Sequence, residues 1–128
     1  MFEYYNPNPA GIHVGDCVIR ALCKLTDKDW ETVYFGVCME GMRLHDMPSS
    51  NSVWGKYAER QGLRKRLLPD TCPDCYTVER FTSEHKNGSY LLATGSHVVA
   101  SINGTYFDSW DSGNEILVYF FERSENNG

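Results

Sequence analysis

Cys17, His97 and Asp108 are the residues of this chain whose types suit nucleophilic thiol chemistry. In such chemistry a cysteine attacks a carbonyl carbon, an imidazole carries the proton, and a carboxylate orients the imidazole. Cys17 follows Asp16, a residue type favoured at helix N-caps, so we expect the thiol in the first turn of a helix. The helix dipole and the free N–H groups of that turn favour a thiolate and an oxyanion, whereas the charge of Asp16 disfavours the thiolate.

A predicted hairpin places His97 beside Asp108. Asn103-Gly104 is a strong signal for a two-residue turn, and counting back from it sets His97 opposite Trp110. Asp108 then lies diagonally across from His97, roughly 7–8 Å away along the backbone. We expect these three side chains on one face of the hairpin. A strand-end histidine satisfied by a neighbouring acid is the structural alternative for this pair, and the presence of Cys17 favours catalysis over it.

The pattern along the chain divides one domain, residues 1–128, into three parts. Residues 1–15 are rich in Pro, Asn and Gly and are interpreted as a loop that lines the cleft. Residues 16–85 are expected to be mainly helical, with helices at about 16–25, 29–41, 51–61 and 77–85. Residues 89–122 are expected to form an antiparallel sheet, with strands at 89–94, 97–102, 105–108 and 115–122. Helices followed by antiparallel strands predict an α+β fold.

The composition is that of a folded domain, because 41% of the residues are apolar and 23% are charged. With 12 Lys and Arg against 17 Asp and Glu, the net charge of −5 argues against a nucleic-acid or anionic-membrane partner. The basic run Arg64-Lys65-Arg66 is interpreted as solvated surface. No stretch approaches the roughly 20 apolar residues of a membrane span, and the N-terminal segment has no apolar signal-peptide core. Five cysteines, an odd number, then favour reduced thiols and a cytoplasmic location.

The other four cysteines are expected to take no part in catalysis. Cys23 and Cys38 fall inside predicted helices beside apolar residues and are interpreted as buried, inert thiols. Cys72 and Cys75 are interpreted as part of a loop that leads into the fourth helix. A zinc site there would need four ligands, and only two scattered histidines could complete it. We therefore predict no metal and no cofactor.

The order of these features resembles the papain-like cysteine peptidase superfamily: a cysteine opens the first long helix, a histidine opens a later strand and an aspartate lies on the next strand. Asp16-Cys17 with Ala21-Leu22, and later His97-Val98-Val99, look like segments of the peptidase domains that process double-glycine leader peptides. Residues 15–21 (Gly-Asp-Cys-Val-Ile-Arg-Ala) and 106–113 (Tyr-Phe-Asp-Ser-Trp-Asp-Ser-Gly) extend the likeness. With them the chain also resembles small, uncharacterised cysteine peptidases of Firmicutes and their phages.

The resemblance implies a papain-like fold, in which N-terminal helices pack on a C-terminal antiparallel sheet, and a protein or peptide substrate. It implies that Cys17 is the nucleophile, that His97 is first a general base and then a general acid, and that Asp108 orients the imidazole. The oxyanion-hole glutamine of the family usually lies six residues before the cysteine, where this chain has Gly11. Asn8, three residues earlier, is the candidate amide donor in its place.

The predicted function is a cysteine peptidase, a thiol hydrolase that cleaves a peptide or isopeptide bond. Trp54, Trp110 and Val99 are the candidate walls of its substrate cleft. Two alternatives stay open: acyl transfer to an amine, of the transglutaminase type, and a catalytically silent binding module with the same fold. The missing glutamine and the acidic neighbour of Cys17 are the features that favour the silent module.

Overall fold

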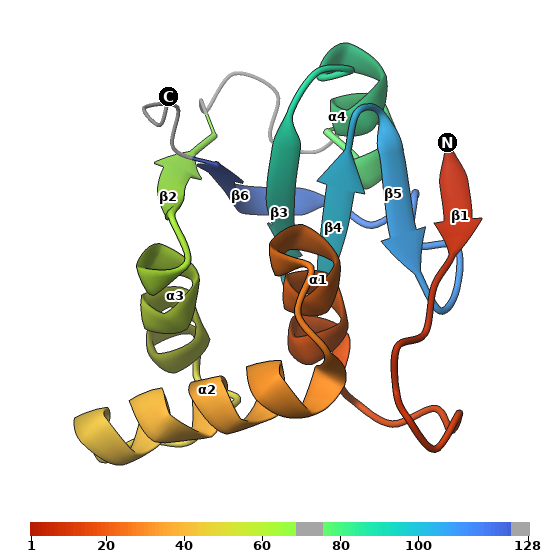
Figure 1. The fold of residues 1–128 in the computed structure, drawn as a ribbon. Coiled ribbons are helices and arrows are strands. Elements are labelled where there is room, and N and C mark those ends of the chain that lie inside the picture. The colour runs from red at the N-terminus through yellow and green to blue at the C-terminus, as the bar shows by residue number, and fades with distance from the viewer. Residues whose placement is uncertain (69–75, 124–128) are drawn as a thin grey trace.

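The computed structural model describes residues 1–68 and 76–123, which form four helices and a six-stranded sheet (Figure 1). The helices are α1 (Cys17–Thr26), α2 (Trp30–Leu44), α3 (Asn51–Arg60) and α4 (Val78–Glu84). The strands are β1 (Phe2–Tyr4), β2 (Leu63–Leu67), β3 (Ser89–Thr94), β4 (Val98–Ile102), β5 (Thr105–Asp108) and β6 (Leu117–Arg123). The α+β class predicted from the sequence is confirmed.

The sheet is mixed, in the order β1-β5-β4-β3-β6-β2. The four strands expected within residues 89–122 pair antiparallel as predicted, and the unexpected strand β1 makes the sheet mixed. β1 runs parallel to β5, whereas the other neighbouring strands are antiparallel. The two edge strands are the ones that the sequence did not indicate, since β1 lies in the expected loop and β2 in the expected helical region. β2 carries the basic run Arg64-Lys65-Arg66, whose side chains are exposed as expected. These edge strands lack the apolar alternation that predicts a strand.

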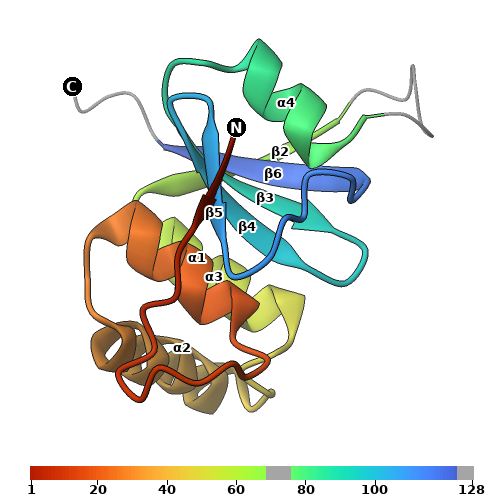
Figure 2. The same ribbon diagram turned by 90° about the vertical axis from the view of Figure 1, so that its right-hand side faces the viewer.

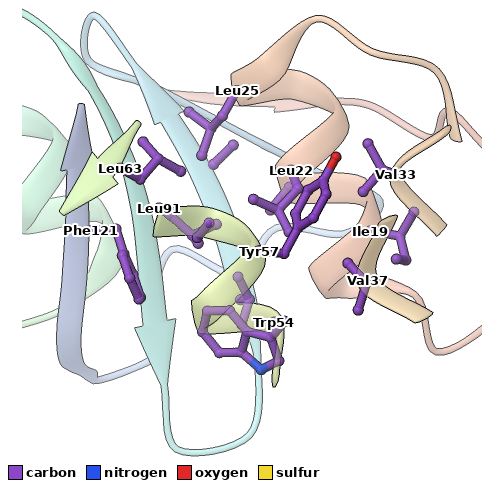
Figure 3. Packing of buried hydrophobic residues seen from close by; sticks show 14 of the residues in the cluster. Ile19, Leu22, Leu25, Val33, Val37, Trp54, Tyr57, Leu63, Leu91 and Phe121 are labelled. Carbon is purple, nitrogen blue, oxygen red and sulfur yellow. The ribbon is translucent and has the colours of Figure 1, made fainter. Parts of the chain in front are cut away.

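Helices cover both faces of the sheet: α1, α2 and α3 lie on one side and α4 on the other (Figure 2). The larger core cluster lies between the sheet and the first three helices (Figure 3). It includes Leu22, Trp54, Tyr57, Leu91 and Phe121. A smaller cluster lies under α4 and contains Phe81 and Val99. Val99, a candidate wall of the cleft, is therefore a core residue, because a helix covers the face of β4 that it occupies.

The predicted hairpin between β4 and β5 is confirmed, and its register is the one expected. Asn103 and Gly104 both have positive φ, 50° and 87°, as a two-residue type I′ turn requires. The last residue of β5, Asp108, also pairs with β1, and the N–H of Tyr5 donates to its backbone oxygen at 2.8 Å. Pairing with β1 thus fixes the end of β5, one residue beyond its last pair with β4.

All four expected helices are present, with modest shifts at their ends. α2 runs on to Leu44 because Gly41 stays inside the helix and His45 ends it in a left-handed conformation, with φ 55°. Asp16 occupies the N-cap position of α1, but its side chain makes no capping hydrogen bond. None of the helices in the described ranges combines the length and apolar character that crossing a bilayer needs.

Candidate active site

Cys17 is the first residue of α1 and is half-buried. α1 packs against β4, and Cys17 at the start of the helix lines the same pocket as Val98 at the start of the strand. The His97 side chain and the backbone N–H of Val98 face the thiol, and both favour its ionised form and lower its pKa. The first N–H groups of a helix have no acceptor within the helix, so those of this turn can serve an oxyanion beside the thiol.

His97 lies between the β3–β4 turn and the first residue of β4. Its backbone is fixed by Thr94, whose N–H and hydroxyl both donate to the His97 carbonyl oxygen, at 2.8 and 3.2 Å. The ring Nε2 lies 2.6 Å from Oδ2 of Asp108, which confirms the predicted contact. Because Nε2 is hydrogen-bonded to the carboxylate, Nδ1 is the ring nitrogen that can exchange a proton with the Cys17 thiol. The ring of Trp110 packs on the imidazole, with ring centroids 4.8 Å apart.

Asp108 is fully buried, and each of its carboxylate oxygens has two polar partners. Oδ1 forms an ion pair with Nη2 of Arg20 at 2.9 Å and accepts a hydrogen bond from the N–H of Ser109 at 2.8 Å. Oδ2 accepts from Nε2 of His97 and from the hydroxyl of Ser112, both at 2.6 Å. Burial raises the pKa of Asp108, but the hydrogen bonds from His97 and Ser112 lower it below its ordinary value overall. The carboxylate is therefore ionised and fixed in orientation.

The thiol and the imidazole favour each other's charged forms. Burial raises the pKa of Cys17, but the hydrogen bond with His97 and the charges of His97 and Arg20 lower it overall. Burial lowers the pKa of His97, whereas its hydrogen bonds with Asp108 and Cys17 raise it, and the net result is about 9. Both shifts favour the pair of thiolate and imidazolium, and the thiolate is the nucleophilic form of a cysteine.

A buried ion-pair network joins Asp16 and Arg20 to Asp108. Nη1 of Arg20 donates to Oδ1 of Asp16 at 2.6 Å, and Nε1 of Trp30 donates to Oδ2 of Asp16 at 2.9 Å. The expectation that Asp16 simply opposes the thiolate is corrected by this pairing, because Arg20 offsets its charge. The sequence reasoning missed Arg20, although a charged residue inside the apolar stripe of a helix signals a buried partner. For Ser112, nothing in the sequence indicates a contact with Asp108.

Cys17 and His97 line an open pocket of about 680 Å³. Its other walls are mainly apolar and include Trp30, Tyr34, Val37, Trp54 and Tyr119. Trp54 is a wall residue as expected. Trp110 is not among the residues that line this pocket. It packs on the His97 ring and is 46% exposed. Cys38 was expected to be buried, and this is wrong, because it is half-buried and lines the pocket as well.

Asn8, the candidate oxyanion donor, is not among the residues that line the pocket. Its side-chain oxygen accepts a hydrogen bond from the N–H of Ala10 at 2.8 Å, within the N-terminal segment. Of the expected cleft-lining loop, Val14 and Gly15 reach the pocket. The N–H groups at the start of α1 are therefore the oxyanion donors that this site offers.

The remaining cysteines add no second centre to the described part of the chain. Cys23 is buried as expected, and burial together with the charges of Asp29 and Asp16 raises its pKa to about 12. Cys72 and Cys75 lie outside the described residues. Among residues 1–68 and 76–123, no group of three or more His, Cys, Asp and Glu side chains is arranged to hold a metal ion.

Comparisons of the chain with protein-family models, with curated proteins and with solved structures find no match. The function is therefore inferred from the geometry of the site itself.

Proposed function

We propose that this protein is a cysteine peptidase, a thiol hydrolase that cleaves a peptide or isopeptide bond. The observation that carries the proposal is that the Cys17 thiol and the His97 imidazole line one pocket, with His97 hydrogen-bonded to the buried Asp108 behind it. A His–Asp pair that only stabilised the fold would not require a thiol beside it, and an inert thiol would not require an imidazole beside it. A helix that opens with the cysteine and packs beside the histidine strand also supports a papain-like fold.

In the first half of the proposed reaction, the Cys17 thiolate attacks the carbonyl carbon of the scissile amide and forms a C–S bond. The N–H groups of the first turn of α1 and the helix dipole stabilise the oxyanion that develops. The imidazolium of His97 donates its Nδ1 proton to the leaving nitrogen, and the C–N bond breaks. The products of this half are a free amine and a thioester on Cys17.

In the second half, neutral His97 accepts a proton from water at Nδ1 while the water oxygen attacks the thioester carbonyl. The C–S bond then breaks, the carboxylic acid leaves, and the thiolate and imidazolium are restored. Asp108 stays ionised throughout and holds Nε2–H, which keeps Nδ1 directed at the reacting atoms.

The apolar pocket indicates the kind of peptide that fits. Aromatic side chains from α2, α3 and β6 form its walls, so a large apolar side chain next to the scissile bond would be desolvated there. We therefore propose a peptide or protein substrate with an apolar residue beside the cleaved bond.

A proteome digested into peptides provides a substrate mixture that tests the proposal. The wild-type protein should create new peptide termini, detected by mass spectrometry, and the Cys17→Ala variant should create none. Cys23→Ala is the matched control, because it removes a second thiol of α1 that lies in the core and outside the pocket, and it should leave the cleavages in place. Equal cleavage by wild type and Cys17→Ala would contradict the proposal. An added labelled amine that appears on the new carboxyl termini would instead indicate acyl transfer.

A further inference from the structure

Arg20 is nearly fully buried, 5% exposed, and its guanidinium lies between two carboxylates. Nη1 donates a hydrogen bond to Asp16 at 2.6 Å, and Nη2 forms an ion pair with Asp108 at 2.9 Å. A buried ion pair adds little net stability compared with apolar side chains of similar size. Packing alone therefore gives no reason for an arginine at this position of α1.

The charges of this network include those of the thiol and the imidazole. Asp16 and Asp108 contribute two negative charges, and Arg20 and the imidazolium of His97 contribute two positive ones. The Cys17 thiolate is then the single excess negative charge. Without Arg20, the thiolate would share a poorly solvated site with two carboxylates and one cation, and like charges in such a site favour the protonated thiol.

Arg20 also fixes the orientation of the carboxylate that holds His97. Arg20 forms an ion pair with Oδ1 of Asp108, so Oδ2 is the oxygen that faces the imidazole and Ser112. A planar guanidinium can reach two carboxylates with two separate N–H groups, whereas the ammonium of a lysine acts as a point charge. The same side chain therefore serves both the charge balance and the alignment.

We propose that Arg20 is a positioning residue of the thiol hydrolase: it aligns Asp108 for His97 and balances the charge of Asp16, and thereby maintains the Cys17 thiolate. This inference rests on the proposed function. The guanidinium of an arginine is a fixed positive charge.

The groups that surround Arg20 and the thiol come from five parts of the fold. Asp16 precedes α1, His97 precedes β4, Asp108 ends β5, and Tyr119 of β6 lines the same pocket as the thiol. α2 contributes Trp30, an uncharged donor. Tyr119 stays neutral in the range of the test, because burial raises its pKa above the ordinary value of 10.0.

The rate at which iodoacetamide alkylates Cys17, followed by mass spectrometry between pH 5 and 9, tests the role of Arg20. In Arg20→Met the rate at pH 6 should fall about tenfold, because the thiolate loses a nearby opposite charge and the alignment of its partner. Asp16→Asn removes the negative partner and leaves Arg20 on Asp108, so its rate should equal or exceed that of wild type. Arg66→Met, on the far edge strand β2, is the matched loss of one positive charge and should change nothing.

A purely structural Arg20–Asp16 pair would instead slow both variants alike, and that result would overturn the proposal. The double variant Asp16→Asn, Arg20→Gln removes both charges together and keeps hydrogen-bonding side chains, so it provides a folded comparison even where Arg20→Met does not fold. Its alkylation rate at pH 6 should lie about tenfold below that of Asp16→Asn alone. Equal rates in these two variants would overturn the role of Arg20.

Alkylation of Cys17 in wild type and in His97→Ala separates the role of Arg20 from the proposed function. Rapid alkylation of wild-type Cys17 that is lost in His97→Ala, together with Arg20 variants that react like wild type, would overturn the role of Arg20 alone. Slow alkylation of wild-type Cys17 that does not depend on His97 would overturn both.

Discussion

The contact between His97 and Asp108 should make a large, pH-dependent contribution to the stability of the fold. The pKa of His97 is raised from 6.5 to about 9; burial opposes the rise, and the hydrogen bond with Asp108 is its strongest cause. A rise of that size corresponds to about 3 kcal/mol in favour of the imidazolium in the folded state. We therefore expect a coupling free energy of about 2–3 kcal/mol between the two side chains when His97 is protonated.

A double-mutant cycle measures this coupling through the free energies of unfolding in urea of wild type, His97→Gln, Asp108→Asn and the double variant. The folded pKa of His97 lies above its unfolded value, so the stabilisation is complete below about pH 6.5 and is lost as the pH rises through about 9. The coupling should thus be about 2–3 kcal/mol at pH 6 and below about 1 kcal/mol at pH 10. The cycle cancels effects that each single substitution has elsewhere, including the lost partner of Arg20.

The same cycle between His97→Gln and Glu59→Gln is the control, because Glu59 is an exposed residue of α3. Its coupling free energy should be zero within error at both pH values. A coupling between His97 and Asp108 below about 0.5 kcal/mol at pH 6 would refute the inferred ion pair. An equal coupling at the two pH values would refute the assigned protonation of His97.

Three further outcomes are expected. Ser112→Ala removes one of the donors to the buried carboxylate of Asp108 and should lower the free energy of unfolding by about 1–3 kcal/mol in urea; an unchanged value would mean that water replaces the hydroxyl. Gly104→Ala places a side chain at φ 87° and should cost about 1 kcal/mol in a thermal melt, against no loss if the hairpin turn relaxes. The rate of peptide cleavage should decline above pH about 9, because His97 then lacks the proton for the leaving amine; a rate that keeps rising to pH 10 would contradict this proton transfer.

The sequence was sufficient for the parts of the site that depend on local rules. The Asn103-Gly104 turn fixes a hairpin register by counting, and that register brings His97 and Asp108 within hydrogen-bond distance. The position of Cys17 at a helix start followed from Asp16 and the apolar spacing behind it. Each of these inferences involves residues that are close in sequence or paired through one tight turn.

The parts that could not be predicted depend on how distant elements cross. Arg20 contacts Asp108 only because α1 packs across the β4–β5 hairpin, an arrangement that no local pattern specifies. Cys38 looked like a core residue of α2, but the helix presents it to the pocket. The edge strands β1 and β2 are held by pairing with β5 and β6, so their own residues carry little strand signal.

The most direct test of the central claim is whether Cys17 forms and clears an acyl-enzyme. The p-nitrophenyl ester of N-acetyl-phenylalanine is mixed with the protein, nitrophenol release is followed, and the acylated residue is identified by mass spectrometry. We expect one acyl group on Cys17, continued turnover, no adduct in Cys17→Ala, and a loss of about 100-fold or more in His97→Ala. An absent adduct on Cys17, or equal rates in wild type and His97→Ala, would contradict the assignment of Cys17 and His97 as a catalytic pair.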